Sequence, residues 1–188
     1  MNAMVGNIDE ATQEGIRWLL QSIGEDPTRE GLVDTPKRVA KAYKEMTEGY
    51  SKNIEEILGT TFEVGDVSQM VIVRHLDFVS LCEHHLLPFT GTASIAYIPK
   101  NRVVGLSKIG RLLDAYSRRL QVQERLTTQI TTALDKYLET EGSAALIRAH
   151  HSCMGCRGVR KASAEMVTSS LTGEFLKHEV RAEFLALA

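Results

Sequence analysis

Two short clusters hold most of the residues in this chain that could bind a metal ion. The first is CEHH at residues 82–85, and the second is HHSCMGC at residues 150–156. Thiolates and imidazoles are the ligands that zinc prefers, and two ligands three residues apart can bind one ion from a single turn. The clusters lie far apart in the sequence, so only folding can bring them together. This spacing favours a metal site inside a globular domain over a small zinc finger.

The local conformation of the second cluster decides between two kinds of zinc site. If residues 151–157 are extended, Cys153 and Cys156 point to opposite sides of the strand. Cys153 then joins Cys82 and one histidine of the first cluster as the three protein ligands. The fourth position of the zinc ion stays free for water, which is the arrangement of catalytic sites.

A closed structural site is the alternative. A bend at Gly155 would turn Cys156 inward and complete a Cys3His set of four ligands, namely Cys82, His85, Cys153 and Cys156. The surplus histidines favour the catalytic interpretation. His84 and His151 each neighbour a proposed ligand, and hydrolytic chemistry needs proton carriers near neutral pH.

Several basic residues could bind an anionic substrate. Lys108 and Arg111 lie three residues apart, off the apolar stripe of a helix that Ser107 is expected to cap. The free amides of a helix N-terminus, together with two cations, favour phosphate. Arg38 and Arg157 add two further cations. Each charge alone is more simply a solvated surface residue, but as a group beside a metal they indicate a polyphosphate.

Glu124 follows Gln123 at the expected start of a long helix. The simple interpretation is an acid that complements the helix dipole. The functional one is a carboxylate that accepts two N–H donors from a base such as guanine, because it offers two acceptors in one plane.

The elements that must position these residues fall into two blocks. Residues 1–68 are expected to form a helical arm, with helices near residues 16–23, 35–46 and 54–58. Residues 69–188 are expected to form one α+β domain in the order β-β-α-α-β-β, an antiparallel sheet with helices on one face. The expected strands are 70–73 continuing through 78–81, 90–98, 144–152 and 163–170. The expected helices are 107–116, one from about residue 122 that Gly142 closes, and 179–187.

Composition excludes several classes of protein. Of 188 residues, 43% are hydrophobic, enough for a substantial core, and the net charge of −2 is unlike the basic excess of a duplex binder. No apolar run approaches the roughly 20 residues that span a bilayer, and residues 1–9 lack the pattern of a secretory signal. Three cysteines, an odd number, favour thiols used as ligands in a reducing cytoplasm.

Longer motifs contain these residues, and together they resemble one known family. The motifs are CEHH at 82–85, VGLSKIGR at 104–111, QVQERLT at 121–127 and H-x-C-x-x-x-R-G at 151–158. The upstream segments EDPTREGL and TPKRVAKAY agree as well. The chain resembles GTP cyclohydrolase I in the family's order over nearly its whole length from Asp9.

This resemblance implies an activity, a fold and an assembly. The enzyme would hydrolyse and rearrange GTP to 7,8-dihydroneopterin triphosphate and formate, the first step of tetrahydrofolate and pterin biosynthesis. Its fold would be the tunnelling fold, whose unit is the β-β-α-α-β-β order expected above. Members of the family form toroidal homodecamers of two pentamers, with active sites between subunits and one zinc ion per subunit.

The resemblance also implies roles for individual residues. Zinc would be ligated by Cys82, His85 and Cys153, which selects His85 over His84, and His84 and His151 would transfer protons. Glu124 would anchor the guanine, with Gln123 close by. The ribose and triphosphate would be surrounded by Arg38, Ser107, Lys108, Arg111 and Arg157.

Two residues depart from the pattern of the family. Position 156 is not usually cysteine, and a passive small residue is favoured here over a fourth ligand, because strand parity directs Cys156 away from the metal. Gly110 should loosen its helix by roughly 1 kcal/mol relative to alanine.

Overall fold

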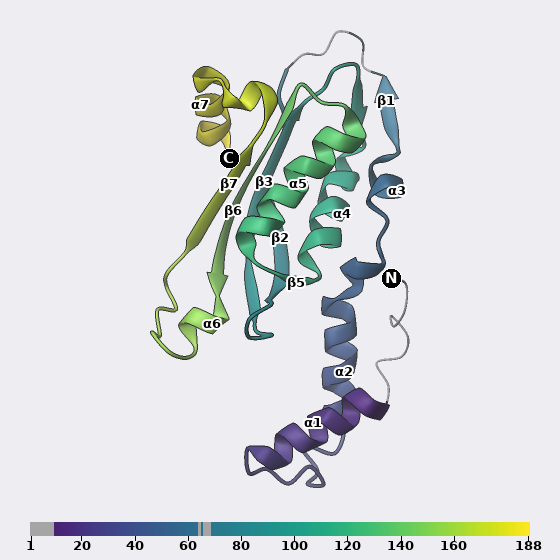
Figure 1. The fold of residues 1–188 in the computed structure, drawn as a ribbon, viewed down its shortest axis with the longest axis vertical. Coiled ribbons are helices and arrows are strands. Elements are labelled where there is room, and N and C mark those ends of the chain that lie inside the picture. The colour runs from purple at the N-terminus through teal and green to yellow at the C-terminus, as the bar shows by residue number, and fades with distance from the viewer. Residues whose placement is uncertain (1–9, 64, 66–68) are drawn as a thin grey trace.

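A helical N-terminal segment precedes an α+β arrangement in the computed structural model, which describes residues 10–63, 65 and 69–188 (Figure 1). This segment, the arm, contains α1 (Glu10–Ser22), α2 (Thr35–Met46), the 3-10 turn η1 (Glu48–Ser51) and α3 (Ile54–Leu58). The three expected helices are confirmed, although α1 begins six residues before its expected start and η1 was not expected. The expected domain boundary at residue 68 and the N-terminal segment 1–9 lie outside the described residues. The division into arm and domain therefore stays a prediction.

The domain is built on a five-stranded sheet in the order β5-β2-β3-β6-β7. Its strands are β2 (Val71–Cys82), β3 (Pro88–Ile98), β5 (Leu120–Gln121), β6 (Gly142–His151) and β7 (Met166–Leu171). All neighbours pair antiparallel except β5, which runs parallel to β2. With α4 (Leu106–Ser117) and α5 (Gln123–Leu138) between the two hairpins, the expected β-β-α-α-β-β order is confirmed.

The strand expected at 70–73 and continuing through 78–81 is confirmed as β2. The bulge between Val73 and Leu76, where His75 has a φ of 58°, was not expected. The short strand β5 was not expected. Neither was a second sheet of two strands, β1 (Thr61–Glu63) and β4 (Arg102–Val104).

Two helix boundaries also differ from expectation. Gly105 is the N-cap of α4, so Ser107 lies within the first turn. The backbone N–H of Lys108 donates to the Gly105 carbonyl at 2.8 Å, which starts the helix before Ser107 can cap it. The second boundary is the C-terminal end of α5. This helix ends at Leu138, because Glu139 takes a left-handed conformation, and not at Gly142, which was expected to close it.

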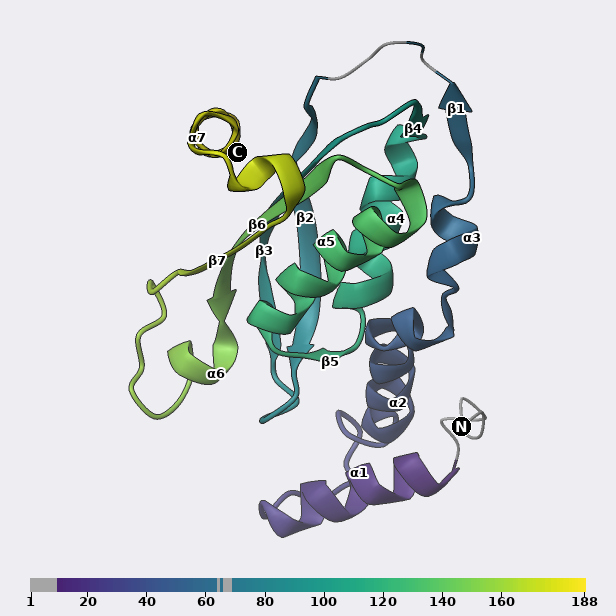
Figure 2. The same cartoon turned by 45° about the horizontal axis from the view of Figure 1, so that its top comes forward.

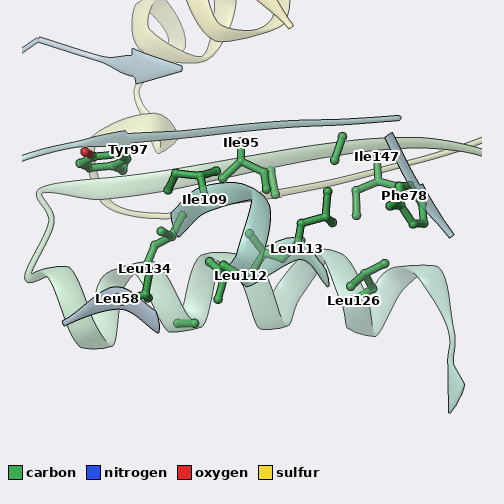
Figure 3. Close-up of a cluster of buried hydrophobic side chains, with 14 of the residues drawn as sticks. Leu58, Phe78, Ile95, Tyr97, Ile109, Leu112, Leu113, Leu126, Leu134 and Ile147 are labelled. Carbon is green, nitrogen blue, oxygen red and sulfur yellow. The ribbon is translucent and has the colours of Figure 1, made fainter. Parts of the chain in front are cut away.

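The main core lies between the sheet and the helices α4 and α5, which cover one of its faces (Figure 3). Ile95 and Tyr97 project from alternate positions of β3 toward Leu112 of α4 and Leu134 of α5, and all four are at most 1% exposed. Burial of this many large apolar side chains is the main force that holds the helices on the sheet.

The opposite face of the sheet is partly covered, which the expectation of helices on one face did not include. Ala96 and Leu146 point to this face and pack with Phe175 and Phe184, whose rings meet edge to face at 5.7 Å. These aromatic residues belong to η2 (Gly173–Leu176) and α7 (His178–Leu187), the helix expected at the C-terminal end.

Five segments converge at the end of the domain nearest the arm (Figures 1 and 2). They are the end of β2, the tip of the β2–β3 hairpin, β5, the start of α5 and the short helix α6 (Ser152–Gly155). The two clusters of candidate ligands lie here. Among the described residues, no helix is both long and apolar enough to cross a bilayer.

Candidate metal centre and active site

The first cluster forms a tight turn at the end of β2. The backbone N–H of Cys82 donates to the Leu87 carbonyl at 2.8 Å, and the Cys82 carbonyl accepts from the N–H of Leu86 at 2.9 Å. Leu86 takes a φ of 55°, which lets the chain reverse into β3. The turn brings Nδ1 of His84 and Nδ1 of His85 to 3.8 and 3.7 Å from the Cys82 sulfur.

The second cluster is not extended, so the strand parity expected for residues 151–157 was wrong. β6 ends at His151, and residues 152–155 form the single helical turn α6, closed by a hydrogen bond from the Cys156 N–H to the Ser152 carbonyl. β3 and β6 pair Phe89 with His151. This register sets the turn that carries Cys153 beside the tip of the β2–β3 hairpin.

Folding brings Cys82, His85 and Cys153 together. One ligand atom from each of the three lies within 4.8 Å of the others. Cys82 is buried, His85 is exposed and Cys153 is half-buried, so the cluster opens to solvent on one side. Burial and the neighbouring Cys82 thiol raise the pKa of Cys153, whereas Arg157 acts in the opposite direction. A divalent cation would favour the thiolate form of both cysteines.

Cys156 is exposed and is not a member of this three-residue cluster. The helical turn, rather than strand parity, accounts for its position. In the described part of the chain, the set of candidate ligands is therefore Cys2His and not the closed Cys3His alternative.

His151 is held from two sides. Its ring stacks on Phe89 with centroids 4.4 Å apart and planes 6° apart, and its Nε2 lies 2.9 Å from Oε1 of Gln123. Burial lowers the pKa of His151, and the nearby Glu124 carboxylate opposes this change. Gln123 and Glu124 lie in the first turn of α5, as expected, and Glu124 is exposed.

A further contact steadies the first cluster. Arg125 of α5 forms an ion pair with Glu83, and its guanidinium also donates to Oε1 of Gln121 at 3.0 Å. The hydrogen bond from Arg125 holds the pKa of the Glu83 carboxyl below its ordinary value. Tyr43 of α2 adds a hydrogen bond from its hydroxyl to the Leu86 carbonyl at 3.0 Å. Sequence reasoning missed Phe89, Arg125 and Tyr43, because only strand register and tertiary packing reveal them.

Most of the expected phosphate-binding residues do not join the cluster within one chain. α4 ends beside β5, which pairs with Cys82, so its first turn lies about 15 Å away along the helix axis. That turn carries Ser107 and Lys108. Arg111 instead lines a cavity of about 350 Å³ with residues of η1 and α3.

The two remaining cations also lie on the surface. Arg38 is exposed on α2 and pairs with Asp34 at 3.3 Å, whereas Arg157 follows α6 and lies near Cys153. Arg157 is thus the one member of the expected set that the structure places beside the candidate metal ligands.

The sheet order and the two helices match the tunnelling fold that the family resemblance implies, and a candidate Cys2His set of metal ligands lies at one end of the sheet. The model of the GTP cyclohydrolase I family matches residues 12–188. GTP cyclohydrolase 1 from Bartonella quintana is 52% identical over 172 residues, covering 91% of this chain and 84% of that protein. GTP cyclohydrolase 1 from Campylobacter jejuni subsp. doylei is 49% identical over 176 residues, covering 93% of each chain.

The chain belongs to the GTP cyclohydrolase I family, and its activity is the conversion of GTP to dihydroneopterin triphosphate. Among solved structures, the apo form of an archaeosine synthase, QueF-Like, is similar with a TM-score of 0.46 and 14% identity. That likeness covers 55% of this chain and 93% of the other. The fold assignment rests on the strand order and not on this likeness.

Proposed function

We propose that Cys82, His85 and Cys153 bind one zinc ion and that the purine ring of GTP is opened beside it. The convergence of these three side chains from two distant segments is the observation that carries the proposal. Two sulfurs and one imidazole nitrogen are a ligand set that zinc accepts, and three protein ligands are typical of catalytic sites. When bound, zinc supplies Lewis acidity and activates water at neutral pH.

His84 and His151 are the proposed proton carriers. Opening the imidazole ring of guanine and releasing its C8 as formate requires protons to be delivered to ring nitrogens and removed from attacking water. Imidazole titrates near neutral pH and can do both. His84 is exposed beside the cluster, with its Nδ1 3.8 Å from the Cys82 sulfur, and His151 lies two residues before Cys153.

Glu124 is the proposed anchor for the guanine base. Its exposed carboxylate lies close enough to His151 to influence the pKa of that imidazole. A base held by two N–H donors to this carboxylate would lie between the α5 N-terminus and the cluster, which orients C8 toward the metal ligands. The helix-dipole interpretation of Glu124 remains compatible with this position, since both use the same turn.

Ser107, Lys108 and Arg111 are proposed to bind the triphosphate of a GTP molecule held by a neighbouring copy of the chain. Within one chain the first turn of α4, which carries Ser107 and Lys108, lies about 15 Å along the helix axis from the strand that pairs with Cys82. The proposal includes, by family resemblance, a homodecamer whose sites lie between subunits. Arg157 would contact the triphosphate from the cluster side, and Arg38 would contribute from the arm.

Incubation of zinc-loaded protein with GTP, followed by oxidation and dephosphorylation, should produce the fluorescence of neopterin together with formate. Glu124→Gln should weaken GTP binding by about 10-fold or more, because a neutral amide replaces one acceptor with a donor. Its zinc content should stay that of the wild type. Unchanged GTP affinity in Glu124→Gln would show that Glu124 only complements the helix dipole. Absence of neopterin after incubation of the wild-type protein with GTP would overturn the proposal as a whole.

A further inference from the structure

Gln123 is the first residue of α5, and its side chain is engaged entirely inside the protein. It is 1% exposed. Its amide nitrogen lies 3.1 Å from the Ile147 carbonyl and 3.0 Å from the Met166 carbonyl, and its amide oxygen lies 2.9 Å from Nε2 of His151. A side chain so engaged has no amide group left for a substrate, although family resemblance placed Gln123 near the guanine.

The two carbonyls determine which way the amide of Gln123 faces. Backbone carbonyls of β6 and β7 only accept hydrogen bonds, so the NH2 group of the amide must point to them. The reverse orientation would place the amide oxygen against two acceptors in a buried environment, which is costly. The oxygen is therefore directed at His151.

The oxygen of Gln123 in turn determines which nitrogen of His151 carries hydrogen. An amide oxygen only accepts, so Nε2 must donate, in the neutral ring and in the imidazolium alike. Stacking on Phe89, with planes 6° apart, restricts rotation of the ring out of this hydrogen bond. Nδ1 is the nitrogen that remains for proton exchange.

We infer that Gln123 is a positioning residue that holds His151 in the Nε2–H form and directs its proton transfers to Nδ1. The role of His151 as a proton carrier rests on the proposed function, but the tautomer does not. The hydrogen bond between Gln123 and His151 also connects His151 to the first turn of α5, which carries Glu124. The N-terminal turn of α5 therefore positions both the proposed guanine anchor, Glu124, and the proposed proton carrier, His151.

The ¹⁵N NMR spectrum of zinc-loaded, histidine-labelled protein tests the tautomer directly. At a pH where His151 is neutral, its signals, assigned by their loss in His151→Ala, should show a protonated Nε2 and a bare Nδ1. In Gln123→Met the same ring should shift toward a mixture of tautomers. An Nδ1–H ring in the wild type would overturn the inference, whether or not the variant folds, and so would a spectrum that Gln123→Met leaves unchanged.

Kinetics test the consequence for turnover. Gln123→Met should lower kcat by about 100-fold while the KM for GTP changes less than about threefold, since a misdirected histidine impairs proton transfer and not binding. In a His151→Ala background the same substitution should change kcat by less than about twofold. Equal losses in both backgrounds would reveal a general structural role, and a rise in KM alone would reveal a substrate contact. Either result would overturn the inference.

Thr131→Val is a control for the loss of buried hydrogen bonding between α5 and β7 that Gln123→Met also causes. The hydroxyl of Thr131 on α5 lies 2.7 Å from that of Ser170 on β7, a contact between the same two elements that does not reach His151. The Thr131→Val protein should be less stable than the wild type, but its kcat and the tautomer of His151 should be those of the wild type. Wild-type protein that fails to turn over GTP would count against the proposed function. The NMR result tests only the tautomer of His151, so it can be interpreted whether or not the protein turns over GTP.

Discussion

At the scale of single residues, Cys153 and Cys156 stand three positions apart in entirely different surroundings. Cys153 is half-buried beside Cys82, whereas Cys156 is exposed at the end of α6. The sequence favoured Cys153 as the ligand for a reason that the structure does not support, since residues 152–155 are helical and not extended. The distinction between the cysteines is a product of tertiary position, which strand parity could not supply.

Replacement of each cysteine by alanine should therefore have opposite results. Cys156→Ala should keep one zinc ion per chain and wild-type formate release. Cys153→Ala should lose zinc and turnover, because two remaining ligands hold the ion too weakly. Zinc content by atomic absorption, measured after dialysis, checks both. Loss of zinc from Cys156→Ala would restore the closed structural site as the better account.

The choice between His84 and His85 shows where residue-level prediction stops. Both rings lie within 3.8 Å of the Cys82 sulfur, and spacing alone did not separate them. The family resemblance implied His85, and the ligand geometry with Cys153 likewise includes His85 and omits His84. That geometry depends on the path of the turn after Cys82, where Leu86 has a positive φ. Leucine rarely adopts a positive φ, so the sequence does not predict this turn.

At the scale of elements, the turn that carries the first cluster is attached to α5 by the Glu83–Arg125 ion pair. Arg125 also donates to Oε1 of Gln121 and to the carbonyl of Leu120 in β5, the strand beside Cys82. Because the pair is exposed, it contributes little to folding. Its effect should instead be on the orientation of the metal ligands that flank Glu83.

Arg125→Met should thus lower the affinity for zinc by about 10-fold with little change in the free energy of unfolding. Competition with a chromophoric chelator measures the affinity, and denaturant unfolding measures the stability. Arg102→Met is the matched control. It removes an exposed pair with Glu63, at 3.0 Å, between β1 and β4 and away from the cluster. Equal zinc affinity in the two variants would refute a role for Arg125 in holding the turn.

Local patterns predicted most of the elements but not their pairing. The apolar stripe of α5 and the run from Thr90 to Ile98 have clear periods, so both were expected nearly as they occur. The register that sets Phe89 against His151, and the strand β5, depend on contacts between distant segments. Alternation of apolar and polar residues identifies which side chains share one face of a strand. It does not specify which residue of the neighbouring strand pairs with each of them.

At the scale of the whole molecule, the expected substrate residues divide between two regions. Glu124 and Arg157 lie near the cluster, whereas Ser107 and Lys108 lie at the far end of α4. Within one chain these two groups lie at different ends of α4. The family resemblance predicts sites between subunits, and that a neighbouring copy supplies Ser107 and Lys108 is part of the proposed function.

Co-expression of two inactive variants tests this division. Cys153→Ala and Lys108→Ala each disable a different half of the site, so random assembly should restore intact sites at about one quarter of interfaces. The recovered rate of neopterin formation measures that fraction. Co-expression of Cys153→Ala with His85→Ala, which damage the same half, should recover nothing. A mixed Cys153→Ala and Lys108→Ala enzyme as inactive as its parents would show that one chain supplies both halves.

X-ray absorption at the zinc edge tests the central claim most directly. Zinc-loaded protein should show two sulfur neighbours at about 2.3 Å and two nitrogen or oxygen neighbours at about 2.0 Å. The sulfurs would be those of Cys82 and Cys153, one nitrogen that of His85, and the remaining neighbour solvent. A spectrum with three sulfur neighbours, or protein that retains no zinc, would contradict a three-ligand catalytic centre.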